Sequence, residues 1–220
     1  MKRRRFLEST GIATVISTSG CIGPLSNNPR SNEPFSHPST TNLDSQPFIG
    51  PSPSVDNPVI IAFEDLACPF CRSFHQNTLN ELKQEYISNN DLTFVFRGTD
   101  FAGYPWSGTA ALVHEAVYEQ ETEKTFDVIE QYYNNQERFN SSNVIEESRS
   151  MLENMDINAD SVINSVQNGD VSDNFESDKS SGRNADIRGT PSFVLLKNGL
   201  YMTTVVGAKN ISVFESILSL

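Results

Sequence analysis

Short continuous apolar runs mark the strands that we expect in this chain. Val59–Phe63 and Leu92–Phe96 have the length and uniform hydrophobicity typical of strands buried on both faces. Ser192–Leu196 and Leu200–Val206 flank Lys197-Asn198-Gly199, in which Asn-Gly is a strong turn signal. The pattern therefore predicts two central strands and a C-terminal hairpin.

The other apolar positions recur at helical spacing. One helix face is expected between the first two strands, made by Cys71, Phe74, Thr78, Leu82 and Tyr86. Every periodic segment from about residue 104 to 186 is helical, and residues 211–218 end the chain as a helix. The order strand, helix, strand, helical insertion, hairpin, helix favours an α/β fold that starts with a right-handed parallel unit.

The first twenty residues have the three zones of an export signal. A basic zone at residues 2–5 precedes a weakly apolar zone and a small-residue end. Arg3-Arg4-Arg5-Phe6-Leu7 resembles the twin-arginine export motif. Thr18-Ser19-Gly20-Cys21 resembles a lipobox, which would make Cys21 the lipidated residue and new N-terminus. The alternative interpretation is a basic tail with a free cysteine.

Residues 21–57 predict a disordered tether. Seven of the chain's eleven prolines lie between Ile22 and Asn57, together with many Ser and Asn residues and no periodicity. Such a segment buries too little apolar surface to offset its ordering entropy. Pro47-Phe48-Ile49-Gly50 fits a short first strand packed against the domain, and His37 is given no role. The folded domain is therefore expected at residues 58–220.

The charge balance narrows the function classes. The formal net charge is −12. Without the four cations and one acid of residues 1–20 it becomes −15, which excludes a binder of the nucleic-acid backbone. An acidic, lysine-poor surface favours a protein adapted to high salt, as in halophilic archaea, over an ordinary acidic secreted protein. No apolar run is long enough for a membrane-spanning helix.

The strongest chemical signal is Cys68-Pro69-Phe70-Cys71 between a strand and a helix. Pro is favoured at the first helical position, so Cys68 lies at the helix N-terminus, where the dipole and free N–H groups favour a thiolate. Cys71 follows one turn later, poised for thiol–disulfide exchange. Three alternatives stay open: a zinc site with His75, a purely structural disulfide, and unrelated core cysteines.

A second motif makes the pattern specific. Gly189-Thr190-Pro191-Ser192-Phe193 stands just before the hairpin, about 120 residues after the cysteine motif. Together the two motifs resemble the DsbA-like branch of the thioredoxin fold. Asp65 and Lys197-Asn198-Gly199 also fit that family. The resemblance extends over residues 46–220.

The resemblance implies a fold and a groove. It implies a thioredoxin fold with an inserted all-helical subdomain at about 104–186 and a mixed sheet of four or five strands. It also implies that Pro191 is cis and lies beside the Cys68–Cys71 pair. Thr190 would offer its backbone to an extended substrate, and Pro69 and Phe70 would complete the groove.

Two residues depart from the family pattern. Relatives carry a buried Glu six positions before the first cysteine, thought to move the proton of the second cysteine, and this chain has Ala62 there. Glu64 or water would have to replace it. The residue before Cys71 is Phe rather than His, so no imidazolium lies inside the motif. His75 either influences a sulfur or is an ordinary surface histidine of the helix.

These features predict an extracytoplasmic thiol–disulfide oxidoreductase without cofactor or metal. Cys68 would attack and Cys71 resolve, most simply to form disulfides in cysteine-containing exported proteins. A membrane quinone-linked thiol oxidase would restore the disulfide. The protein would be a monomer anchored through Cys21, or secreted if the lipobox is unused. The alternatives are a reductase or isomerase, and a non-catalytic or metal-binding domain.

Overall fold

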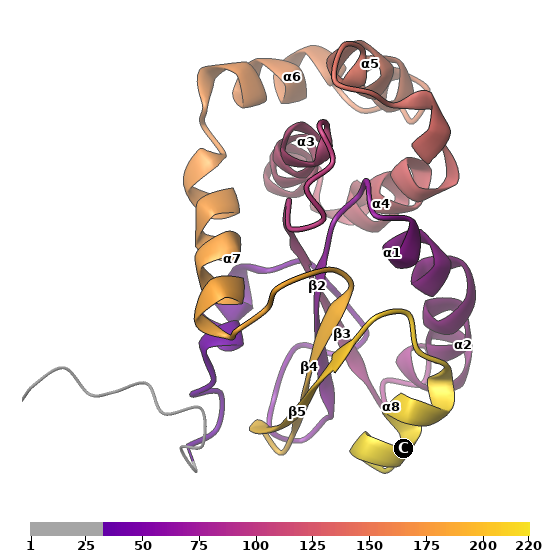
Figure 1. The fold of residues 1–220 in the computed structure, drawn as a ribbon, viewed down its shortest axis with the longest axis vertical. Helices are drawn as coiled ribbons and strands as arrows, with labels where there is room; N and C mark the ends of the chain where they lie inside the picture. The colour runs from indigo at the N-terminus through magenta and orange to yellow at the C-terminus, as the bar shows by residue number, and fades with distance from the viewer. Residues whose placement is uncertain (1–32) are drawn as a thin grey trace, which may run out of the picture.

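A five-stranded mixed sheet forms the centre of the molecule (Figure 1). The computed structural model describes residues 33–220, so the predicted export signal and Cys21 lie outside the described residues. The strands run in the order β1-β3-β2-β4-β5 across the sheet. Their bounds are β1 Phe48–Ile49, β2 Val59–Glu64, β3 Thr93–Gly98, β4 Ser192–Lys197 and β5 Leu200–Val206.

The strand pairing places the ends of distant segments side by side. β2 pairs in parallel with β3 and antiparallel with β4, and β4 forms a hairpin with β5. β1 adds to the outer edge of β3. Phe63 near the end of β2 lies opposite Ser192 at the start of β4. The segments that follow Phe63 and precede Ser192 therefore meet at one end of the sheet.

Helices cover both faces of the sheet and one of its ends. Residues 69–87 form a long helix, α-helical at α1 Pro69–Phe74 and α2 Asn80–Leu82 and more widely wound at His75–Leu79 and Lys83–Ile87. This long helix and α8 cover one face of the sheet, and α7 covers the opposite face (Figure 1). The rest of the helical insertion lies over the end of β2 (Figure 1). The remaining bounds are α3 Ser107–Gln120, α4 Thr125–Asn134, α5 Val144–Glu153, α6 Ala159–Asn168, α7 Ser172–Asn184 and α8 Ile211–Leu218.

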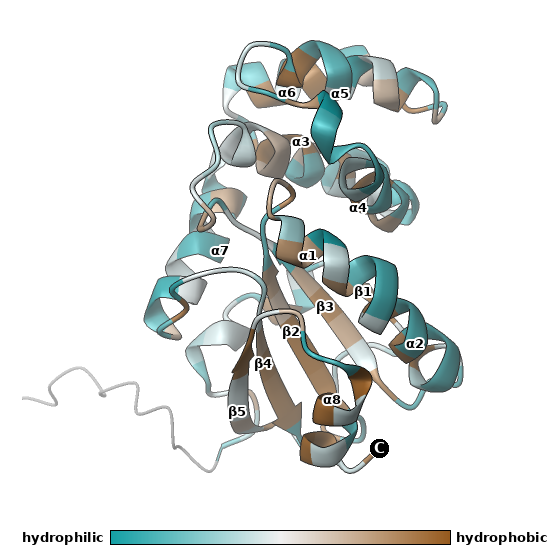
Figure 2. Ribbon diagram, turned by 45° about the vertical axis from the view of Figure 1, so that its right-hand side comes forward, coloured by the Kyte–Doolittle hydropathy of each residue, from teal (hydrophilic) through white to brown (hydrophobic). Residues whose placement is uncertain are grey.

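Alternating strand residues supply two separate apolar cores. Ile60 and Ala62 of β2 face the core beneath α1 and α8, whereas Ile61 and Phe63 face the core on the α7 side. Figure 2 shows the strands as the most hydrophobic part of the ribbon. The uniform hydrophobicity of β2 thus reflects burial on both faces, as predicted. The fold agrees with the predicted α/β class and with the expected mixed sheet of four or five strands.

The structure differs from the predicted tether at residues 33–57. Short 3₁₀ turns form at Pro38–Thr40 and Leu43–Ser45, and Leu43 is buried in the core on the α7 side. The His37 ring stacks on Tyr201 with ring centroids 4.3 Å apart. Polar composition predicted disorder here, but a few well-spaced apolar side chains are enough to fix a segment that lies against an existing core.

A buried ion pair fastens this segment to the helical insertion. The Arg97 guanidinium of β3 donates to Asp178 of α7 over 2.5 Å, and both side chains are almost fully buried. Arg97 also donates to the backbone carbonyl of Thr41. One cation therefore holds together the sheet, α7 and the N-terminal segment.

No helix within residues 33–220 has the length and apolarity to cross a membrane.

Candidate active site

The turn after β2 is built around the buried carboxylate of Asp65. Its Oδ1 accepts the N–H of Ala67 over 2.8 Å, and its Oδ2 accepts the N–H of Ala102 over 3.1 Å. The backbone carbonyl of Asp65 accepts the N–H of Cys68 over 2.9 Å. Burial raises the pKa of Asp65, while these backbone hydrogen bonds oppose the rise. The carboxylate thus fixes the path of the chain into α1.

Cys68 directly precedes α1, and its backbone is extended. Pro69 lies in the first turn of the helix. The carbonyl of Cys68 accepts the N–H of Arg72 over 3.1 Å. The Gln136 side chain, which follows α4, donates to the carbonyls of Cys68 and Leu66 over 3.0 and 2.8 Å. No sequence pattern points to Gln136, because its contact joins residues separated by almost seventy positions.

The second motif lies directly against the first. The peptide bond between Thr190 and Pro191 is cis. The Cys68 thiol donates to the backbone carbonyl of Thr190 over 3.4 Å. Pro191 is buried and its carbonyl accepts the N–H of Gly207 over 2.8 Å. The two motifs that the sequence separates by about 120 residues therefore form one site.

The two sulfurs differ in exposure. Cys68 is 3% exposed and Cys71 is fully buried. Both are free thiols, so the structure shows the dithiol form of the pair. Phe70 between them is 65% exposed. Only Cys68 keeps an edge open to solvent, at a surface that presents a large aromatic ring.

The pKa values of the two thiols also differ, with the more exposed Cys68 the more acidic. The hydrogen bond from Cys71 is the largest cause that lowers the pKa of Cys68, to about 6; the Thr190 side chain also lowers it, while burial opposes the shift. Burial raises the pKa of Cys71 well above its ordinary value, and the hydrogen bond to Cys68 and the charge of Glu64 add to the rise. At neutral pH the pair thus holds a thiolate at Cys68 and a thiol at Cys71.

A buried polar cluster lies beneath Cys71. Glu64, the last residue of β2, is fully buried. Its Oε1 lies 3.1 Å from Nε2 of His75, and its Oε2 accepts the Tyr133 hydroxyl of α4 over 3.1 Å. Burial raises the pKa of Tyr133, and the charge of Glu64 adds to the rise, which keeps its hydroxyl a donor.

This cluster settles the position of His75. The side chain is buried rather than on the helix surface, and its Nδ1 has no hydrogen-bond partner among the described residues. Tyr133 lies in a segment predicted to be helical, and its spacing gives no information about its hydroxyl. Within residues 33–220, no three His, Cys, Asp or Glu side chains gather as a metal site.

The lowered pKa gives a direct chemical prediction. In the reduced protein, alkylation of Cys68 by iodoacetamide should follow a titration with its midpoint near pH 6, because only the thiolate reacts. Cys71→Ala removes the largest stabilising hydrogen bond and should move the midpoint upward by at least about one unit. Mass spectrometry of the alkylated peptide measures both. A midpoint at pH 8 or above in the unaltered protein would contradict the assignment.

Comparisons with known proteins agree with this geometry. A family model described as thioredoxin matches residues 45–201. Over 84 residues the chain is 32% identical to "Probable disulfide bond formation protein D" of Bacillus cereus, which covers 38% of each protein. The chain therefore matches well under half the length of this curated relative.

Solved structures show the same fold at low sequence identity. Oxidised BdbD from Bacillus subtilis superposes with a TM-score of 0.69 at 20% identity, covering 80% of this chain and 92% of that one. Alpha-DsbA1 from Wolbachia pipientis gives 0.67 at 18% identity, covering 79% and 89%. Because the family model spans most of the chain and the architecture agrees, the chain belongs to the thioredoxin family and has the fold of its DsbA-like members.

Proposed function

We propose that this protein is a thiol–disulfide oxidoreductase that forms disulfides in cysteine-containing proteins outside the cytoplasm. The observation that carries the proposal is the unequal pair of sulfurs: a stabilised thiolate at Cys68 and a buried thiol at Cys71. Proximity to the cis Pro191 segment supports it, because that segment offers backbone groups beside the reactive sulfur. The printed name of the Bacillus cereus relative is consistent with this role.

The proposed reaction starts from the Cys68–Cys71 disulfide. A substrate thiolate attacks the Cys68 sulfur, forming a mixed disulfide and releasing Cys71, which takes up a proton. A second substrate thiolate then attacks the substrate sulfur of the mixed disulfide and releases Cys68 as a thiolate. Two electrons pass from the substrate to the cysteine pair, so no cofactor is needed. A low pKa makes Cys68 a good leaving group, which favours oxidation over reduction.

The substrate groove is proposed to run past the exposed edge of Cys68. Thr190 and Pro191 form one side, and Pro69 and the exposed Phe70 form the other. Val206, 61% exposed, pairs with Ser192 next to Pro191 and extends the apolar surface. An unfolded chain with apolar side chains near its cysteine would fit this surface. A membrane quinone-linked thiol oxidase is proposed to restore the disulfide.

The roles of the two sulfurs can be separated by trapping. Cys71→Ser should allow a substrate disulfide to be attacked by Cys68 but prevent resolution, so covalent adducts should accumulate. Cys68→Ser should give neither turnover nor adducts, because Cys71 is fully buried. Non-reducing gels after incubation with a scrambled, disulfide-containing protein provide the measurement. Adducts on the Cys68→Ser variant alone would reverse the assignment, and adducts on neither would refute the enzymatic role.

Glu64 is proposed to replace the buried Glu that relatives carry at the position of Ala62. The two residues are two positions apart on β2, and side chains on alternate strand positions share one face of the sheet. Glu64 raises the pKa of Cys71 through its charge, so it lies within electrostatic reach of that sulfur. We assign Glu64 the task of passing a proton to and from Cys71, with His75 and Tyr133 holding its two oxygens.

A cavity borders this cluster at His75 and Tyr133. This small cavity of about 90 Å³ lies between the long helix and α4, lined by His75, Gln76, Asn80, Glu130, Tyr133 and Asn134. A cavity of this size can hold water beside polar groups. The path proposed for the proton therefore runs from Cys71 to Glu64, then through His75 to solvent.

Replacing Glu64 tests this path. Glu64→Gln keeps the shape and can still accept a hydrogen bond, but it cannot carry the proton. We expect the step that opens or closes the Cys68–Cys71 disulfide to slow by at least about tenfold. Stopped-flow measurements of the reaction with glutathione would show this, while the alkylation midpoint of Cys68 stays near pH 6. The matched control is Glu81→Gln, which alters an exposed carboxylate that lies on the long helix and does not line the cavity. Unchanged rates in Glu64→Gln would contradict the relay.

The cellular location stays a prediction that rests on residues 1–21. We propose twin-arginine export and lipid anchoring at Cys21, with the domain on the outer face of the cell membrane. Fractionation of a Cys21→Ala variant checks the anchor, since an unchanged membrane-bound fraction would exclude it. The halophilic origin also stays a prediction, supported by the acidic composition of the sequence.

A further inference from the structure

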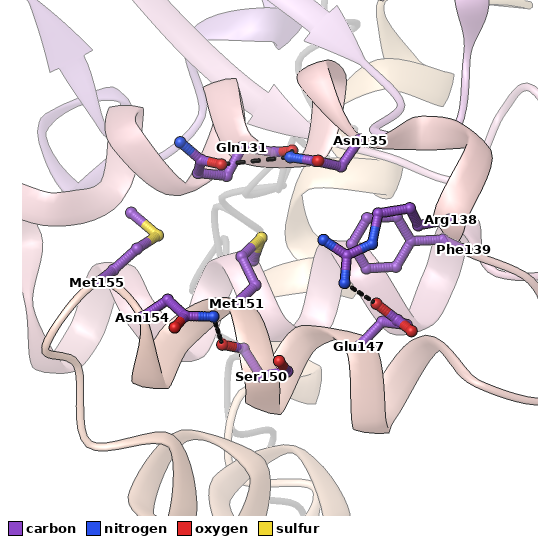
Figure 3. Close-up of a pocket in the computed structure, with 9 residues that line it drawn as sticks. All are labelled: Gln131, Asn135, Arg138, Phe139, Glu147, Ser150, Met151, Asn154 and Met155. Atoms are coloured by element: carbon purple, nitrogen blue, oxygen red, sulfur yellow. Dashed lines mark hydrogen bonds and ion pairs between the residues drawn. The ribbon is translucent and has the colours of Figure 1, made fainter.

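A larger cavity lies within the helical insertion, away from the cysteines. Its volume is about 280 Å³, and it lies between α4 and α5, with the turn Gln136–Arg138 and Phe139 at one end (Figure 3). Its walls are formed by Gln131, Asn135, Arg138, Phe139, Glu147, Ser150, Met151, Asn154 and Met155. Nothing in the proposed redox chemistry uses these side chains.

Carboxamide groups with unused hydrogen-bonding capacity line both walls. Asn135 of the α4 wall donates to the carbonyl and side-chain oxygens of Gln131 over 2.8 and 3.2 Å. Asn154 of the α5 wall donates to the carbonyl of Ser150 over 2.7 Å. Gln131 Nε2, Asn135 Oδ1 and Asn154 Oδ1 make no hydrogen bond within residues 33–220. The cavity thus offers a donor and acceptors of the kind that pair with peptide groups.

The rest of the lining is apolar and adaptable. Met151 lies on α5 and Met155 lies two residues beyond its end, and both are half-buried. Methionine is unbranched and polarizable, so it accommodates side chains of different shapes. Arg138 and Glu147 neutralise each other across a 2.7 Å ion pair. The cavity therefore offers no unpaired charge for a phosphate or a metal ion, but it suits a neutral peptide with apolar side chains.

The turn Gln136–Arg138 at one end of the cavity also contacts the active site. Gln136, within the turn that closes the cavity, donates to the carbonyl of Cys68. Its neighbour Glu137 forms an exposed ion pair of 3.2 Å with Arg72 of α1. A polypeptide whose cysteine is bonded to Cys68 could therefore pass along this turn and reach the cavity.

We propose that the cavity binds a stretch of unfolded polypeptide that flanks the reacting cysteine of the substrate. The carboxamides bind its peptide groups, and the two methionines receive an apolar side chain. This inference deepens the proposed function, since it rests on an unfolded protein being the substrate. It predicts that the protein distinguishes long polypeptides from small thiols at a surface separate from the cis-proline groove.

Binding without redox chemistry provides the test. The ligand is a fluorescent, unstructured peptide with Leu and Phe residues and its single cysteine alkylated, and anisotropy reports its affinity. The double variant Met151→Ala, Met155→Ala should weaken binding by at least about fivefold. Asn154→Trp should do the same by filling the cavity, and it should fold because Asn154 is exposed. Met202→Ala, which changes an exposed methionine of β5, is the matched control and should bind normally.

Oxidation rates then separate this inference from the proposed function. Both cavity variants should oxidise reduced, unfolded protein with kcat/KM lowered at least about fivefold, and glutathione at the unaltered rate. Equal peptide affinity in all variants would overturn the cavity proposal even if the enzyme is active. Peptide binding that depends on the cavity, in a protein that oxidises neither substrate, would instead overturn the redox function.

Discussion

The packing of Cys68 against the cis Thr190–Pro191 segment is the constraint on which the rest of the site depends. It exists because β2 and β4 are antiparallel neighbours with Phe63 opposite Ser192. That register brings the start of α1 to the segment that precedes β4. A shift by one residue would turn every inward side chain of β4 outward, so the two apolar cores of the sheet also fix the geometry of the sulfur.

The chemistry follows from an asymmetry of environment rather than of residue type. Two cysteines one helical turn apart receive opposite treatment: hydrogen bonds stabilise a negative charge at Cys68, and burial disfavours it at Cys71. The charge of Glu64 raises the pKa of Cys71 further and so widens the difference between the two thiols. Glu64 lies two positions after Ala62 on the same face of the strand, so its carboxylate stays within reach of Cys71, as the family's buried Glu would be. Its two oxygens contact His75 and Tyr133.

The sequence predicted those features that depend on local pattern. The strands, the hairpin and the start of α1 follow from hydrophobic runs, Asn-Gly and Cys-Pro. Such local patterns do not predict contacts between distant segments. Gln136 binds Cys68 through a side chain with no distinctive neighbours, and the surface position considered for His75 was wrong because a partner eleven residues away buries it. Residues 33–57 were likewise misjudged, because composition does not show that Arg97 and a preformed core hold them.

The most direct test of this account is the reduction potential of the Cys68–Cys71 pair, measured by equilibration with glutathione buffers. Stabilisation of the Cys68 thiolate favours the dithiol form, so the disulfide should be more oxidising than that of a reducing thioredoxin, with a potential between about −120 and −230 mV. A potential of about −270 mV, typical of reducing members of the fold, would contradict the proposal that this protein forms disulfides.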